Sequence, residues 1–98
     1  MKSYKKAIEE NIPTMLVFEH AGMHDAVAVH YLVRALKAKY AGKAHVIPVD
    51  ASYNGQYKVD YKLKEYPTYI VYKQGEELMR ESGDKSIAAL EDMITRAL

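Results

Sequence analysis

The sequence predicts an α/β domain whose elements follow one another in the order α-β-α-β-α-β-β-α. Short apolar or β-branched runs at 15–18, 45–50 and 66–73 have the length and composition of strands. Around them, apolar residues recur at spacings of three and four, which is the pattern of helices with one buried face. Gln74-Gly75 is typical of a two-residue hairpin turn. Because a helix separates the first two strands and a hairpin joins the last two, the pattern predicts a mixed sheet of four strands.

Local signals place the first helix and mark one strand as unusual. Ser3 is expected to cap a helix over 4–11, which must end before Pro13. In the strand 45–50, Pro48 cannot donate a hydrogen bond to a neighbouring strand. This proline therefore indicates an edge strand, a bulge or the end of the strand.

The junction between the first strand and the long helix is where we expect a functional site. The helix should run over 23–40 and end before Gly42. Asp25 then lies in its first turn, where a carboxylate favours the helix dipole, and this structural role is preferred to a functional one. Ligands gather at such strand-to-helix junctions in open α/β folds, because helix N-termini present unpaired N–H groups.

The second half of the chain contains a short helix, a hairpin and a last helix. The short helix is expected over 56–64, with three tyrosines four residues apart, Tyr53, Tyr57 and Tyr61. The lysines of this helix are expected to face solvent rather than to form a patch that binds nucleic acid. The final strand, over 76–81, should end at Gly83. Asp84 or Ser86 is expected to cap the last helix, whose buried stripe contains Ile87, Leu90 and Ile94.

Composition excludes several classes of function. The 98 residues are expected to form one domain over 1–98, and the formal net charge of +1 predicts no nucleic-acid or membrane partner. No apolar run is long enough to cross a bilayer, and the first dozen residues have no apolar leader core, so a cytoplasmic protein is expected. There is no cysteine, which excludes disulfides, thiolate nucleophiles and dithiol redox chemistry. No cofactor is expected.

Three local motifs resemble those of the thioredoxin family. Tyr66-Pro67-Thr68 is similar to the family's Ile-Pro-Thr, and Tyr72-Lys73-Gln74-Gly75-Glu76 is similar to its Phe-Lys-Asn-Gly-Glu hairpin. Gly83 falls where the family has a glycine between the last strand and the last helix. The resemblance covers residues 3–98 and implies a thioredoxin-like fold, with three layers α/β/α around a central mixed four-stranded sheet. It also implies that Pro67 is cis and faces the loop that holds the family's active site.

The chain departs from this family at every residue that carries redox chemistry. Counting back from Tyr40, the family's Cys-Gly-Pro-Cys falls on Met23-His24-Asp25-Ala26. Its preceding tryptophan falls on Gly22, and its buried acid falls on Val17. Thiol–disulfide exchange is therefore excluded for this chain, and an enzyme is not expected.

The resemblance leaves a groove as the candidate binding site. Its two walls are residues 22–26 (Gly22, Met23, His24, Asp25 and Ala26) and residues 66–68 (Tyr66, Pro67 and Thr68), and we call these two segments the candidate groove. In this fold an extended peptide lies against the backbone of the residue before the proline, so a protein or peptide partner is expected, with Tyr66 as a flat anchor. Nine tyrosines against one phenylalanine also suggest self-association as a homodimer, or tyrosines that only cover the sheet.

Two other interpretations stay open. One is that the chain is a divergent or cysteine-substituted member of a thiol–disulfide redox family, with a role in cell redox homeostasis; cysteines at positions 23 and 26 of the natural chain would favour it. The weaker one is a metal site or an acid–base pair in the loop that holds Glu19, His20, His24 and Asp25. Against a metal site, nothing guarantees that His20 and His24 share a face.

Overall fold

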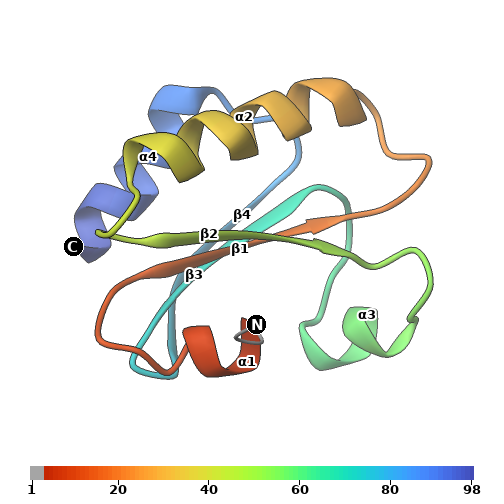
Figure 1. Ribbon diagram of the computed structural model, residues 1–98. Coiled ribbons are helices and arrows are strands. Elements are labelled where there is room, and N and C mark those ends of the chain that lie inside the picture. Colours follow the sequence, from red (N-terminus) through yellow and green to blue (C-terminus); the bar gives the residue numbers. More distant parts are fainter. Residues whose placement is uncertain (1–3) are drawn as a thin grey trace.

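The computed structural model, described for residues 4–98, is a sheet of four strands between two pairs of helices (Figure 1). Helices α2 and α4 cover one face, and α1 and α3 lie on the other (Figure 1). The elements follow the expected order: α1 (Tyr4–Ala7), β1 (Thr14–Glu19), α2 (Ala26–Lys39), β2 (His45–Asp50), α3 (Gln56–Asp60), β3 (Thr68–Lys73), β4 (Glu76–Ser82) and α4 (Ile87–Ala97). The predicted three-layer α/β/α architecture is confirmed.

The sheet is mixed, as predicted, with the strand order β2-β1-β3-β4. Strand β1 is central and pairs in parallel with β2 and antiparallel with β3, and β3 pairs antiparallel with β4. Pro48 lies opposite Val17 in β2, which has only one neighbouring strand. An edge position tolerates the missing N–H of a proline, so the edge-strand interpretation is confirmed.

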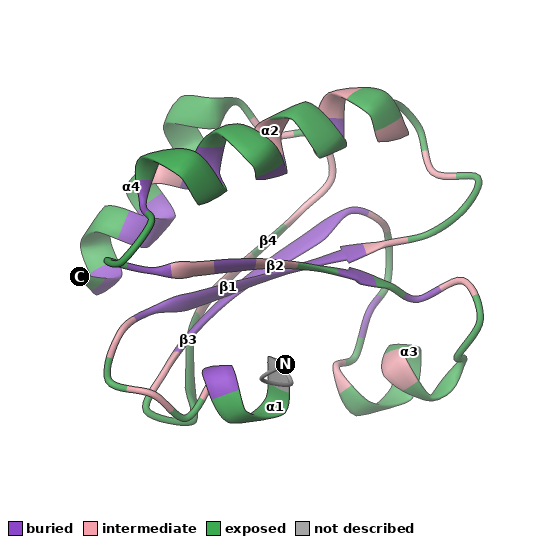
Figure 2. Ribbon diagram, viewed as in Figure 1, coloured by how far each residue is buried: buried purple, intermediate pink, exposed green. Residues whose placement is uncertain are grey.

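Both faces of β1 are buried, because helices cover the sheet on both sides (Figure 2). Met15 and Val17 belong to the core under α2 and α4, whereas Leu16 and Phe18 belong to the core on the side of α1 and α3. The alternation follows from the two-residue period of a strand. It also puts Glu19, two residues after Val17, on the face toward α2.

Helices α1 and α3 are shorter than predicted. Helix α1 ends at Ala7 rather than at residue 11, and the amides of Glu9 and Glu10 bond to carbonyls only three residues back, so the chain leaves the α-helical pattern. The expected cap, Ser3, lies outside the described residues. Helix α3 ends at Asp60, because Lys62 adopts a left-handed conformation with φ of 54°. Tyr53 lies before the start of that helix and is 90% exposed, while Tyr57 and Tyr61 pack against Phe18.

The C-terminal elements agree well with the prediction. Gln74 and Gly75 both have positive φ, as a two-residue hairpin turn requires, and β4 extends one residue beyond the expected end. Of the two candidate caps for the last helix, Ser86 is the one that acts: its hydroxyl accepts a hydrogen bond from the Ala89 amide at 3.1 Å.

Candidate functional site

The loop between β1 and α2 forms the first wall of the candidate groove. Helix α2 begins at Ala26, three residues later than predicted, because Asp25 is left-handed with φ of 57° and ψ of 45°. Asp25 therefore stands at the N-cap of α2 rather than in its first turn as predicted, and its side chain makes no capping hydrogen bond. Within the loop the Met23 amide bonds to the His20 carbonyl at 3.0 Å. A hydrogen bond also joins this loop to the segment after β2: the Ala21 amide donates to the Ser52 hydroxyl at 2.6 Å.

The second wall is the turn that leads into β3. The peptide bond between Tyr66 and Pro67 is cis. The Pro67 carbonyl accepts the Gly83 amide at 2.9 Å, and the Thr68 hydroxyl donates to the Glu65 carbonyl at 2.6 Å. Within residues 4–98, by contrast, neither the N–H nor the C=O of Tyr66 has a hydrogen-bond partner.

A ring contact joins the two walls. The His20 and Tyr66 rings lie 5.1 Å apart between centroids, with an interplanar angle of 37°. His20 directly follows β1, Tyr66 lies two residues before β3, and these two strands are neighbours. The strand ends therefore bring the loop and the proline turn together. His20 was expected only as a weak metal ligand.

The predicted groove residues differ in how much surface they offer. Gly22, His24 and Asp25 are exposed, while Met23, Ala26 and Tyr66 are half-buried. Pro67 and Thr68 are buried, and the Thr68 hydroxyl is held within the protein by Glu65 and by Ser82. Tyr66 and Met23 are thus the large half-buried side chains of the groove, and His24 is exposed beside them.

An ion pair that the sequence reasoning missed lies behind the first wall. Glu19, at the end of β1, faces His30 of α2, with 3.5 Å between Glu19 Oε2 and His30 Nε2. Burial raises the pKa of the Glu19 carboxyl, and His30 opposes this shift while Asp50 adds to it. The signal available in the sequence was a carboxylate two residues beyond Val17, on a strand whose face is otherwise apolar. His30 is largely exposed on α2, so no pattern of burial in the sequence marked it as the partner of Glu19.

The pair does not extend into a metal site. Among residues 4–98, no three histidine or acidic side chains converge as the ligands of an ion. Glu19 turns toward His30, while His24 and Asp25 are exposed on the loop. Glu19, His20, Ala21, Ala26, His30 and Asp50 together line a small cavity of about 160 Å³. This cavity is thus lined by two carboxylates and two imidazoles, but among the described residues they do not come together as a set of metal ligands.

No protein-family model and no curated protein matches the sequence. Among solved structures, a designed protein superposes with a TM-score of 0.81 at 22% identity, over 95% of this chain and 82% of that one. A mutant thioredoxin of Entamoeba histolytica, with one cysteine replaced by serine, superposes with a TM-score of 0.80 at 20% identity, over 95% of this chain and 89% of that one. At this identity the likeness shows the fold, so the chain has a thioredoxin fold, as predicted.

This thioredoxin fold carries no thiol. Met23 and Ala26 stand at the positions assigned to the family's cysteines, and the full sequence contains no cysteine. Dithiol exchange is therefore excluded for the chain. No helix among the described residues is both long and apolar enough to cross a membrane.

Proposed function

We propose that this chain is a redox-inactive thioredoxin-fold module that binds an extended segment of a protein partner in the candidate groove. One observation supports this proposal above the others: the half-buried Tyr66 keeps both backbone hydrogen-bonding groups unpaired within residues 4–98. Backbone N–H and C=O groups are nearly always paired where they are buried. An extended peptide that runs past Tyr66 would supply both partners through main-chain hydrogen bonds.

The surrounding side chains suit such a ligand. The Tyr66 ring rests on His20 at 5.1 Å, so its orientation is set before a partner binds. A tyrosine offers a large contact area and loses little conformational entropy when it is ordered. Met23 packs against the core under α2 but is only partly buried, and a flexible thioether adapts to different partner side chains. The groove thus combines backbone pairing with two adaptable apolar contacts.

Binding of selected peptides tests the proposal. Peptides would be selected on the immobilised protein from a random display library, and their affinities measured for the unchanged chain and two variants. Tyr66→Ala should weaken binding by about tenfold or more, because a buried interface tyrosine contributes about 2 kcal/mol. Tyr53→Ala is the matched control, since Tyr53 is 90% exposed and lies outside the groove. Equal effects of the two substitutions, or none, would count against the groove.

A second candidate is a cysteine-substituted member of a thiol–disulfide redox family, with a role in cell redox homeostasis. It is favoured by the likeness to a thioredoxin structure, whose fold this chain shares. The double variant Met23→Cys and Ala26→Cys tests it through reduction of insulin disulfides. Catalysis would show that only the thiols are missing, whereas inactivity would show that the loop no longer supports redox chemistry.

The partner could also be a second copy of the chain. Tyr31 and Val27, one helical turn apart on α2, are each 67% exposed and would suit a homodimer contact. Sedimentation would distinguish a homodimer from a monomer. The balanced charge favours a protein surface over nucleic acid or a membrane, and a cytoplasmic location stays a prediction.

A further inference from the structure

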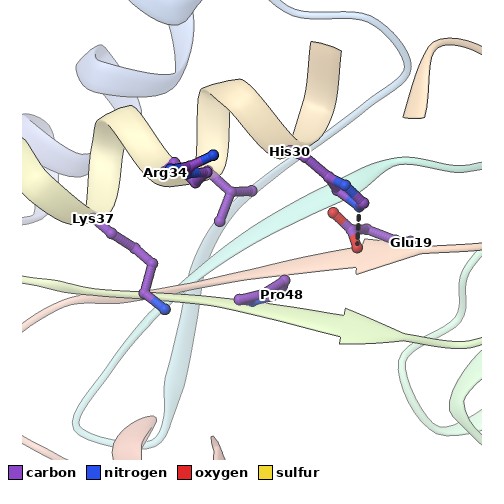
Figure 3. Close-up of a pocket in the computed structure, with 6 residues that line it drawn as sticks. Glu19, His30, Arg34, Lys37 and Pro48 are labelled. Carbon is purple, nitrogen blue, oxygen red and sulfur yellow. Dashed lines mark ion pairs between the residues drawn. The ribbon is translucent and has the colours of Figure 1, made fainter. Parts of the chain in front are cut away.

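A cavity separate from the candidate groove lies between α2 and the edge strand β2. Its volume is about 320 Å³, at the lower end of the range for ligand pockets, so only a small molecule would fit. None of the groove residues lines it. Its wall consists of Glu19, His30, Val33, Arg34, Lys37 and Pro48 (Figure 3).

One end of this cavity presents an acceptor without a donor. Glu19 Oε2 faces His30, but Glu19 Oε1 is buried and has no hydrogen-bond partner within residues 4–98. A buried carboxylate oxygen left without a donor is costly, because it has lost its water and gained nothing in return. A ligand that brings an N–H group to Glu19 Oε1 would remove that cost.

The other end presents cations without anions. Arg34 and Lys37 follow His30 by four and seven residues, so all three share one side of α2. Within the described part of the chain neither Arg34 nor Lys37 has an ion-pair partner. Lys37 extends from α2 toward β2, and Pro48 lies between it and Glu19 (Figure 3). The cavity thus runs from an acid to two unpaired bases across the apolar side chains of Val33 and Pro48.

We propose that this cavity binds a small amino carboxylate, with its amino group on Glu19 and its carboxylate between Arg34 and Lys37. The helical rise places Arg34 and Lys37 about 6 and 10 Å beyond His30 along the axis. An amino acid with two to four carbons between nitrogen and carboxyl oxygen, together with a hydrogen bond at each end, spans that distance. Its methylene groups would lie on Val33 and Pro48.

A titration followed by NMR tests this with γ-aminobutyrate as the probe. We expect saturable shifts of the Glu19, Val33 and Arg34 amides, with the groove residue Tyr66 unaffected. Butyrate lacks the amino group and butylamine lacks the carboxylate, so each should bind at least about tenfold more weakly, the effect of losing one charged hydrogen bond. Shifts that do not saturate, or equal binding of either analogue, would overturn the proposal.

Substitutions separate the two ends of the site. Glu19→Gln and Arg34→Gln should each weaken γ-aminobutyrate binding by about tenfold, because each removes one charged contact. Lys39→Gln is the control: it removes a charge from the same helix, but Lys39 pairs with Glu91 and does not line the cavity. Equal loss of affinity in all three variants would indicate attraction by net charge alone and would also overturn the proposal. Neither result depends on peptide binding in the candidate groove.

Discussion

Replacement of Tyr69 by phenylalanine is expected to stabilise the protein, although it removes a polar group from a tyrosine in the core. Tyr69 is fully buried in β3, and its hydroxyl oxygen has no hydrogen-bond partner within residues 4–98. Burial raises its pKa to about 12, with additional contributions from Glu19 and Asp84. An unpaired buried hydroxyl costs about 1–3 kcal/mol, and the phenyl ring keeps nearly the same packing. Tyr69→Phe should therefore raise the free energy of unfolding by about 1 kcal/mol.

Tyr40→Phe makes the same chemical change where the hydroxyl is paired. Tyr40 is 6% exposed, and its hydroxyl donates to Glu91 Oε1 at 3.0 Å. Loss of a hydrogen bond to a charged acceptor should cost about 1.5–3 kcal/mol. The two variants would thus differ by about 3 kcal/mol in urea unfolding, and their midpoint temperatures would move in opposite directions by several degrees. The reasoning is refuted if Tyr69→Phe destabilises the protein as much as Tyr40→Phe does.

Four further predictions concern titrating groups and helix capping. Because burial raises the pKa of Glu19, the folded state holds its proton more firmly and loses stability as pH rises through the raised pKa; Glu19→Gln should therefore stabilise the protein at neutral pH and not in acid. Glu91→Gln should destabilise the protein at neutral pH and not in acid, because hydrogen bonds from Lys39 and Tyr40 lower the Glu91 pKa. Urea unfolding at a series of pH values measures both effects. Burial raises the Tyr69 pKa to about 12, so its phenolate should appear late in a spectroscopic alkaline titration, and stability should fall as pH rises from about 10 to 12. Ser86→Ala removes the α4 cap and should lower the unfolding free energy by about 1 kcal/mol, whereas Ser86→Asp should retain most of it.

The elements that were predicted well are those with local causes. The hairpin at Gln74 and Gly75 needs two positive φ values, and the sequence at this position is typical of that turn. The Ser86 cap is likewise a property of a few neighbouring residues. The edge position of Pro48 follows from the missing N–H group of proline.

The helix ends were predicted less well, because contacts from elsewhere in the chain decide them. Asp25 and Lys62 adopt left-handed conformations that interrupt an otherwise helical pattern. The loop before Asp25 is held by Ser52, which lies 31 residues from its partner Ala21. No local pattern contains such a contact.

The candidate site divides in the same way. The resemblance to thioredoxins pointed to Tyr66 and the loop, whereas the unpaired backbone of Tyr66 follows from the three-dimensional arrangement. The Glu19–His30 pair joins residues eleven positions apart, and it depends on how α2 is rotated over the sheet. The sequence therefore pointed to the candidate groove but not to the polar groups behind it.

Amide hydrogen exchange at Tyr66 is the measurement that tests the proposed binding function most directly. The exchange rate would be compared for the free protein and for its complex with a display-selected peptide, with the Tyr69 amide inside β3 as the reference. If the peptide pairs with the backbone in the groove, exchange at Tyr66 should slow by about tenfold or more while Tyr69 is unchanged, since one new hydrogen bond protects the amide. A peptide that binds tightly and leaves Tyr66 exchange unchanged would contradict the proposal.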